Sequence, residues 1–502
     1  MFLTMKRPSL KIINYFKLLL NCDKNNIFLL LCIFAPVLMG AFTDLARAGD
    51  SFSLPIHYVI TIFVAIIIYI SLQFSITIGV IAMFIYLIFL GWLRRSLIPS
   101  TGFISNDPII LVSFVVSGLS FIRMLLQRKI PKYTIVSKYI NILMAMMFLE
   151  VLNPFQGGIA VGFGGVIFRL VPIFWYLIGL DRGRRDTVSK IGVTIVIFST
   201  IETFVGLSQT FLGFSEVEKF WIASGGGTQI VGSVKNIGVL YRSVGTLLSF
   251  SEYVYVLLLG AAVSWCMVIS KKYIYLLPFT IIVIALVMSS SRGSIVSLIV
   301  MLVTTMAIQG KNYRSWMPRL FLAVILAFWG LTFSLEKAKD IEKSDQAQAL
   351  IGHQIQGLSD PFGKASTGGS HISLVVNAIL TGFTNPIGFG LGYGTLASKL
   401  GEGGAGSETD YSDMFLALGF PGGVLYVFIC FRILINICKY WHDTRDYLAL
   451  MSIAILVICQ GQWISGAHYS QSMILWFIVG GMDRIIWLYR KKEKEIYSHD
   501  RK

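Results

Sequence analysis

Apolar residues occur along this chain in long blocks that short polar turns separate. Each block holds roughly 17–22 residues, with basic residues, glycine or proline at its ends. An α-helix rises about 1.5 Å per residue, so about 20 apolar residues cross the hydrocarbon core of a bilayer. The pattern therefore predicts about fourteen spanning helices. They lie near residues 26–43, 56–72, 75–93, 109–126, 133–152, 165–181, 187–207, 249–270, 273–290, 294–310, 317–335, 411–433, 446–464 and 471–489.

Composition excludes a soluble fold. Of the 502 residues, 55% are hydrophobic and 14% are charged, whereas a soluble protein carries about 25% charged residues. The mean hydropathy is +0.73. We predict an all-α polytopic membrane protein with about 12 to 14 transmembrane helices. Residues 1–502 are expected to form a single integral membrane domain.

The net charge of +16 follows from topology. If both termini lie in the cytoplasm, most basic clusters fall on that side, as the positive-inside rule expects. Arg94 and Arg95 are exceptions, because they fall outside. Nucleic acid is therefore not an expected partner. The cytoplasmic clusters are Lys6 to Lys24, Arg128 to Lys132, Arg182 to Arg185, Lys271 and Lys272, Lys311 to Arg319, Arg432 to Arg445, and Arg484 to Lys502.

The first apolar block has two interpretations. The lysine-rich start, the apolar run 27–42 and Ala46 to Ala48 imitate a secretory signal with its cleavage site. An uncleaved first span is the preferred interpretation, because it gives an even number of helices with both basic tails inside.

Cysteine placement gives no sign of a disulfide framework or a metal site. None of the six cysteines lies in a predicted outer loop, and no cysteine or histidine cluster has the spacing of metal ligands. We expect neither a metal nor another cofactor.

Two outer loops are longer than the others, near residues 208–248 and 336–410. Loops of this length usually have a function or are disordered. In the second, the charged stretch Glu336 to Gln354 suits an exposed helix. His371 to Leu380 has the three-and-four spacing of an amphipathic helix. A glycine-rich turn, residues 385–394, follows, and can approach a ligand or re-enter the membrane.

Arg292 is the most informative single residue, because apolar runs flank it on both sides. An arginine at bilayer depth costs roughly 2.5–3.5 kcal/mol unless it snorkels, pairs or faces water. The neighbouring serines and Gly293 favour a wet helix tip on the outer side. Arg242 lies at the same membrane level, ahead of another span. Two guanidinium groups there make a site for an anion such as a lipid diphosphate.

Other outer residues add candidate chemistry. Glu408 and Asp410 end the long loop, and His371 begins the amphipathic helix; each is a candidate for proton transfer. Arg169, inside the sixth predicted span, pairs with an acid such as Glu150 or supports the substrate site.

Each candidate also has a plainer interpretation. Arg242 would then be an ordinary loop charge, Arg292 an interfacial anchor, and the acids a solvated face. His371 would be a surface residue. His468, which shares the outer side with His353 and His57, is expected to have no catalytic role.

Together these features resemble the bacterial O-antigen polymerase and O-antigen ligase family. The likeness covers roughly residues 190–440 and depends on order and spacing more than on any one motif. The matching stretches are Tyr241 to Thr246, the Ser291-Arg292-Gly293 hairpin tip, and Asn385 to Gly390 followed by Asp410 to Gly423.

The resemblance implies a multi-pass glycosyltransferase of the bacterial inner membrane that works at the periplasmic face without a metal. Its donor would be a glycan on undecaprenyl diphosphate, and its acceptor the next lipid-linked repeat unit of an O-antigen or exopolysaccharide. Arg242, Arg292 and Arg169 would bind substrate; Glu408, Asp410 and His371 are the catalytic candidates. Its partners would be the lipid bilayer, a flippase and a chain-length regulator.

One departure favours a polymerase over a ligase. Ligases of this family resemble one another in a His-Asn pair about eleven residues before the glycine of the next helix. Here Glu408 and Thr409 stand at that place, before Gly419. The alternatives are a ligase that transfers glycan to lipid A core and, from another class, a transporter or flippase of lipid-linked glycan.

Overall fold

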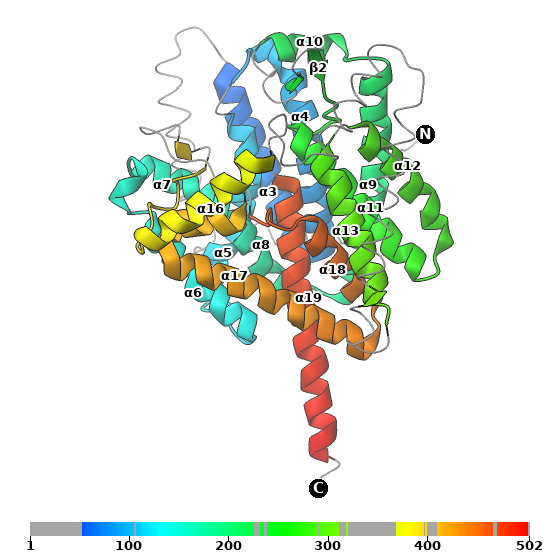
Figure 1. The fold of residues 1–502 in the computed structure, drawn as a ribbon. Helices are drawn as coiled ribbons and strands as arrows, with labels where there is room; N and C mark the ends of the chain where they lie inside the picture. The colour runs from blue at the N-terminus through cyan, green and yellow to red at the C-terminus, as the bar shows by residue number, and fades with distance from the viewer. Residues whose placement is uncertain are drawn as a thin grey trace, which may run out of the picture.

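The computed structural model describes residues 53–104, 107–224, 231–234, 238–289, 291–310, 318–319, 368–395, 397–398, 409–464 and 469–499. Over these residues the chain is a bundle of helices with one short antiparallel ribbon, in which β1 (Val231–Val234) pairs with β2 (Gly238–Tyr241) (Figure 1). In the same residues, eight helices are long and apolar enough to cross a membrane. This supports a multi-pass helical membrane protein.

The helices follow the predicted spans closely. In chain order they are α3 (Ser53–Phe74), α4 (Ile76–Thr101), α5 (Val112–Leu126), α6 (Ile135–Glu150), α7 (Ile159–Gly165), α8 (Val171–Arg182), α9 (Arg185–Phe211), α10 (Glu216–Ala223), α11 (Phe250–Ile269), α12 (Leu276–Met288), α13 (Arg292–Ala307), α16 (Gly368–Thr384), α17 (Asp410–Thr444), α18 (Tyr447–Ile458) and α19 (Tyr469–His499). The short turns are η1 (Pro108–Leu111), η2 (Pro154–Gln156), η5 (Tyr273–Tyr275) and the π-helical η3 (Val166–Leu170).

Some predictions fall outside the described residues. They are the span 26–43, nearly all of 317–335, and the charged stretch 336–354. The count of fourteen spans and the two periplasmic loops therefore stay predictions. The amphipathic helix is confirmed as part of α16, and residues 385–394 form the expected turn.

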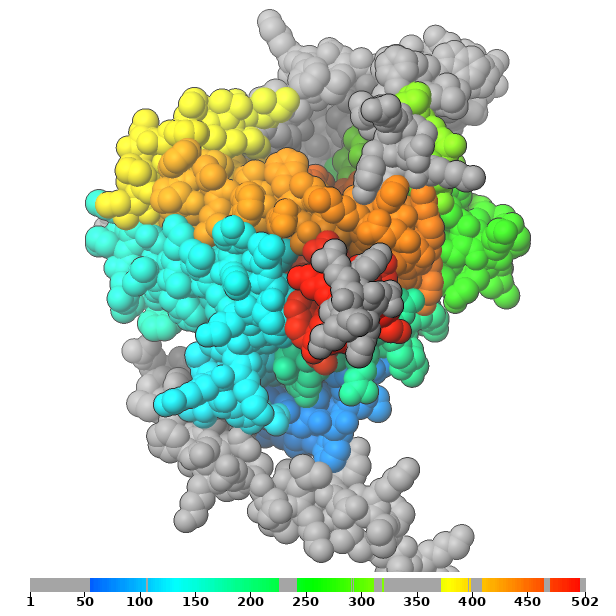
Figure 2. Space-filling view, turned by 90° about the horizontal axis from the view of Figure 1, so that it is seen from below, coloured from blue at the N-terminus to red at the C-terminus, as the bar shows by residue number. Residues whose placement is uncertain are grey.

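Consecutive spanning helices run in opposite directions, and their basic turns meet at one end. Arg182, which ends α8, donates to Leu72 O at the end of α3 (2.8 Å). Arg445 donates to Gly310 O (2.8 Å), and Arg185 pairs with Asp446. We call this the basic end. The last turns of α19 project beyond it (Figure 1), and α17 crosses it beside α19 (Figure 2).

The core centres on α8 and α19, which pack closely because glycines face each other. A Cβ on Gly179 would lie 2.3 Å from Phe477 O, and one on Gly480 would lie 2.1 Å from Tyr176 O. Small residues let the two backbones approach, as is common between membrane helices. Trp175 and Trp476 are fully buried here.

A break in α17 is stabilised by the glycine-rich turn. Gly419 has non-helical angles, and Pro421 lacks the N–H that would bond Ala417 O. The carbonyls of Leu416 and Ala417 instead accept the N–H groups of Phe389 (2.9 Å) and Gly390 (3.1 Å). The turn therefore provides the hydrogen bonds that α17 loses at its break.

At the opposite end of the bundle, the helices end at different heights because their lengths differ. We call this the outer end. With a rise of 1.5 Å per residue, the 20 residues of α11 reach about 30 Å, the 16 of α13 about 24 Å and the 12 of α18 about 18 Å. All three helices pack together. The start of α13 and the end of α18 are therefore recessed relative to the start of α11.

Candidate functional site

The chain between β2 and α11, residues 243–247, is inserted between helices at the outer end. Arg95 of α4, only 2% exposed, donates to Gly245 O (2.7 Å) and Leu247 O (2.8 Å). Its guanidinium also lies 5.2 Å from the centre of the Trp221 ring. Irregular backbone at this depth is tolerated only when its polar groups find partners, and Arg95 satisfies two of them.

Two side chains of α9 satisfy further backbone groups of this segment. Gln209 Oε1 accepts the N–H groups of Val244 (2.9 Å) and Gly245 (2.8 Å). Glu202 accepts both the N–H (2.8 Å) and the hydroxyl of Thr246. Gly245 has a φ of +57°, and a Cβ there would lie 2.1 Å from Glu202 Oε2, so only glycine fits.

Arg242 directly precedes this fixed segment. Its side chain is half-buried, and its guanidinium lies 4.8 Å from the centre of the Phe250 ring, at the start of α11. A cation over an aromatic face is attracted by the ring quadrupole. Arg242 is therefore anchored on both sides: by residues 243–247 along the chain and by Phe250 in space.

Asp410 begins α17 in a buried position. Its side chain is 3% exposed and accepts the N–H of Ile464 (2.7 Å) and the hydroxyl of Tyr426 (3.3 Å). Its own N–H donates to Gly461 O (2.8 Å). These bonds join the start of α17 to the loop after α18. Asp410 thus has a structural role in this geometry.

Arg169 pairs with an acid, as expected, but the acid is Asp413 and not Glu150, the example that the sequence suggested. Nε lies 3.0 Å from one carboxylate oxygen of Asp413 and Nη2 lies 2.6 Å from the other, while Nη1 donates to Leu391 O. Glu150 accepts instead from Asn153 Nδ2 (2.6 Å). Arg169 therefore holds the glycine-rich turn against the start of α17, a pairing that satisfies a buried cation.

Hydrogen bonds connect the start of α11 to the loop after α18. Glu252 of α11 is 1% exposed and accepts the N–H of Ser470 (3.4 Å). The next residue, Gln471, donates to Gln462 O (2.6 Å). Since Ile464 in the same loop donates to Asp410, the neighbourhoods of Arg242 and Asp410 are linked through α19.

Arg292 is the first residue of α13, which agrees with the predicted helix tip. α13 packs against α18, and both are tied to the basic end near Trp441 to Asp446. Their rises of about 24 and 18 Å put the backbone of Arg292 roughly 6 Å above the end of α18. His371 lies in α16 and Glu408 lies outside the described residues, as do His353 and His468.

His57 belongs to a buried polar group at the outer end. Its Nδ1 lies 2.9 Å from Asp107, which also pairs with Arg94 (2.7 Å). Burial alone would raise the pKa of Asp107, but the bonds from His57 and Arg94 outweigh it and hold that pKa below its ordinary value. Arg94 and Arg95 break the positive-inside pattern because each has a structural partner.

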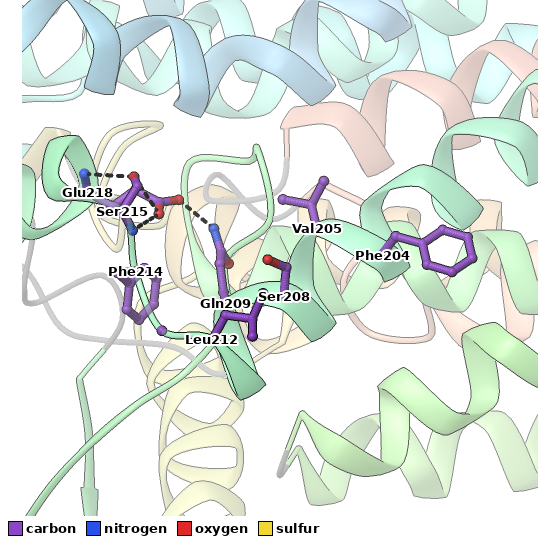
Figure 3. A pocket seen from close by; sticks show the side chains of 9 residues that line it. Phe204, Val205, Ser208, Gln209, Leu212, Phe214, Ser215 and Glu218 are labelled. Atoms are coloured by element: carbon purple, nitrogen blue, oxygen red, sulfur yellow. Dashed lines mark hydrogen bonds between the residues drawn. The ribbon is translucent and has the colours of Figure 1, made fainter.

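A pocket of about 530 Å³ lies beside residues 243–247, between the end of α9 and the start of α10 (Figure 3). Its polar lining includes Gln209 and Glu218, which share a 2.6 Å hydrogen bond. Its apolar lining includes Phe204 and Leu212. Both long polar side chains are already engaged, so the pocket flanks the fixed segment without adding a free charge.

Sequence reasoning missed Arg95, Glu202 and Gln209. The signal that identified Arg292, a charge inside an apolar run, applies equally to Glu202 within the span 187–207. No group of three potential metal ligands occurs in the residues that the structure describes.

No protein-family model, curated protein or solved structure matches this chain. The resemblance to O-antigen polymerases and ligases therefore rests on the sequence stretches that suggested it.

Proposed function

We propose that this protein is a glycan polymerase that transfers a growing oligosaccharide from undecaprenyl diphosphate onto the next lipid-linked repeat unit. The outer end would then face the periplasm of a bacterial inner membrane. The observation that carries the proposal is the recessed, charged arrangement around α11, α13 and α18. There the helix rises put the backbone of Arg292, at the start of α13, roughly 6 Å above the end of α18, and the loop after α18 holds Asp410.

This arrangement suits a lipid diphosphate. The headgroup of a lipid lies at the membrane surface. Its phosphates can therefore contact cations at the starts of helices that begin at this surface. Arg242 is held by the fixed segment and by Phe250, and a pre-positioned guanidinium stabilises charge without reorganising. Negative charge grows on the diphosphate as its bond to the sugar breaks, and the two arginines would stabilise it.

The transfer needs one proton acceptor. A hydroxyl of the acceptor sugar attacks the anomeric carbon of the donor, the bond to the diphosphate oxygen breaks, and the hydroxyl proton passes to a base. Because Asp410 already accepts two hydrogen bonds and is buried, we assign the base to Glu408, with His371 as the alternative. Asp410 and Arg169 then position the start of α17 and the glycine-rich turn.

A second candidate is a transporter or flippase of lipid-linked glycan. The break in α17 at Gly419 and the short α18 favour it, since transporters bind their substrates near broken helices at membrane depth. The two functions differ in product: a polymerase lengthens the glycan, whereas a flippase moves it unchanged.

Arginine substitutions in a strain lacking the native gene test the proposal. Arg242→Ala and Arg292→Ala should each leave mostly single-repeat glycan, because the leaving group loses a stabilising charge. Lys219→Ala is the matched control, since Lys219 is an exposed cation on α10 at the same end. Glycan length is measured on gels.

Normal long-chain glycan in the double arginine variant would contradict the proposed site. Long glycan that accumulates on the lipid carrier would instead identify a ligase. Full activity of Glu408→Gln would transfer the role of base to His371.

A further inference from the structure

A second pocket lies at the basic end, far along α19 from the candidate site. It has a volume of about 330 Å³ and is formed by the start of α6, by α17 and by α19. The residues that carry its chemistry are Tyr133, Asn436, Trp487, Arg490, Lys491 and Lys494. The proposed glycan transfer uses none of them.

The pocket is cationic. Arg490 and Lys494 are exposed, lie four residues apart on one face of α19, and neither forms an ion pair or hydrogen bond with another described residue. Lys491 is shared between Glu495 (3.9 Å) and the Trp487 ring (5.6 Å). Two of the three cations are therefore available to a ligand.

The single acid in the pocket is already engaged. Asp483 is 8% exposed and accepts the hydroxyls of Thr134 (2.5 Å) and Tyr176 (2.8 Å). Asn436 is also 8% exposed, and its side chain has no hydrogen-bond partner among the described residues. Its amide is thus available to donate to an oxygen in the pocket.

Aromatic residues place the pocket at the membrane surface. The rings of Tyr133 and Trp487 lie 4.6 Å apart, and amphipathic aromatic side chains gather at the level of lipid headgroups. Beside them on α6, Ile135 and Ile142 are 50% and 51% exposed, which leaves an apolar surface for acyl chains. A ligand with a phosphate at one end and hydrocarbon at the other matches both surfaces.

We propose that this pocket binds the phosphate headgroup of an anionic phospholipid. The phosphate oxygens contact Arg490, Lys494 and the Asn436 amide, and the acyl chains lie along α6. Basic pockets between membrane helices on the cytoplasmic side bind anionic headgroups in this way. The bound lipid would tie α19 to α6 and α17 at this end.

A thermal-shift titration of the full-length protein in a neutral detergent tests the proposal. Short-chain phosphatidylglycerol should raise the unfolding temperature, and short-chain phosphatidylcholine should not. The Arg490→Gln/Lys494→Gln variant should bind phosphatidylglycerol roughly 30-fold more weakly, since each cation near an anionic surface strengthens binding about fivefold.

The control variant is Lys439→Gln/Lys492→Gln, which removes the same charge at the same end but outside the pocket. It should keep the wild-type affinity. Both variants should elute as the wild type does in size-exclusion chromatography, which shows that they fold. An equal loss of affinity in the control would overturn the proposal. Equal protection by inorganic phosphate alone would overturn the lipid assignment.

Discussion

Arg95, Glu202 and Gln209 lie within helices that cross the bundle, yet each hydrogen-bonds to the same few residues of an irregular segment. Their partners are mostly backbone groups of residues 244–247, which no helix or strand satisfies. Removing one side chain therefore leaves buried groups without a partner, and that cost exceeds the value of the bond itself. The conformation next to Arg242 depends on this set.

Replacing Arg95 tests the dependence. Arg95→Met should destabilise the protein by about 2–4 kcal/mol, because the buried carbonyl of Leu247 loses its donor and Gly245 O keeps only its bond from Gln209 Nε2. Lys219→Met, an exposed change at the same end, should stay within about 0.5 kcal/mol. Thermal unfolding in detergent measures both. An Arg95→Met protein as stable as the control variant would show that the segment does not need this anchor.

Asp107 should make the stability of the protein depend on pH in the acidic range, below about pH 4. Its folded-state pKa lies below the ordinary value of about 3.9, so it contributes stability above that value and loses it as pH falls through the folded pKa. The wild type should exceed Asp107→Asn in stability at pH 7, and the difference should shrink below about pH 4.

Unfolding curves between pH 7 and pH 3 measure this difference, with Asp186→Asn as the control because Asp186 is paired only at the surface. A gap that widens on acidification would mean that the sign is wrong.

The partner of a buried side chain could not be predicted where the two residues lie far apart in the sequence. The sequence indicated that Arg169 needs an acid, but it chose Glu150, 19 positions away, instead of Asp413. Only the fold brings Arg169 of η3 next to Asp413 of α17, 244 positions away. The hydrogen bonds from Arg95 to Gly245 and Leu247 could not be predicted for the same reason, since these residues also lie far from Arg95 in the sequence.

At the scale of elements, the break in α17 and the turn that caps it form one unit. Gly388 has a φ of +88°, and a Cβ there would lie 2.5 Å from both Ala417 O and Gly419 N. Gly419 also has a positive φ, of +64°, and a Cβ on it would lie 2.0 Å from Pro386 O. The backbone of the turn at Gly388 and the backbone of α17 at Gly419 are therefore in contact, and each position requires glycine.

Gly388→Ala should separate the turn from α17. The positive φ costs about 1–3 kcal/mol, and the clash adds to it. Gly118→Ala on α5 is the control, since nothing lies within 4 Å of the added Cβ, and it should be neutral or slightly stabilising. Unfolding temperatures compare the two variants; a stable Gly388→Ala protein would contradict the close contact.

Apolar runs predicted the positions of most helices but not their ends. The run 446–464 suggested one span, whereas α18 stops at Ile458. Gly461, with a φ of +78°, and the glutamines around it mark that stop, and a glycine after a helix is an end signal. The sequence alone does not show whether a helix ends at a glycine inside an apolar run. Buried contacts between distant segments, such as the hydrogen bond from Ile464 to Asp410, determine where α18 ends.

At the scale of the whole molecule, the gathering of basic turns at one end agrees with the alternation predicted from the sequence. Which side of the membrane this end faces follows from the positive-inside rule and stays a prediction. It decides whether the candidate site faces the periplasm, as glycan polymerisation requires.

Cysteine labelling tests the orientation. In a protein whose native cysteines are replaced, Lys219→Cys on α10 should react with an impermeant maleimide in intact cells. Lys129→Cys, at an exposed position of the basic end, should react only after permeabilisation. The reverse labelling pattern would place the candidate site in the cytoplasm and contradict the proposed reaction.

Polymerase activity is measured most directly with purified protein in liposomes that contain an undecaprenyl-diphosphate-linked repeat unit, followed by mass spectrometry of the glycan. A polymerase should produce oligomers of increasing length together with released undecaprenyl diphosphate. Arg242→Ala should slow their formation by about 100-fold or more, the cost typical of removing one charge-stabilising donor. Transfer of the unit across the bilayer with no change in its length would contradict the proposed polymerase. An unchanged rate of oligomer formation in Arg242→Ala would contradict the proposed role of this arginine.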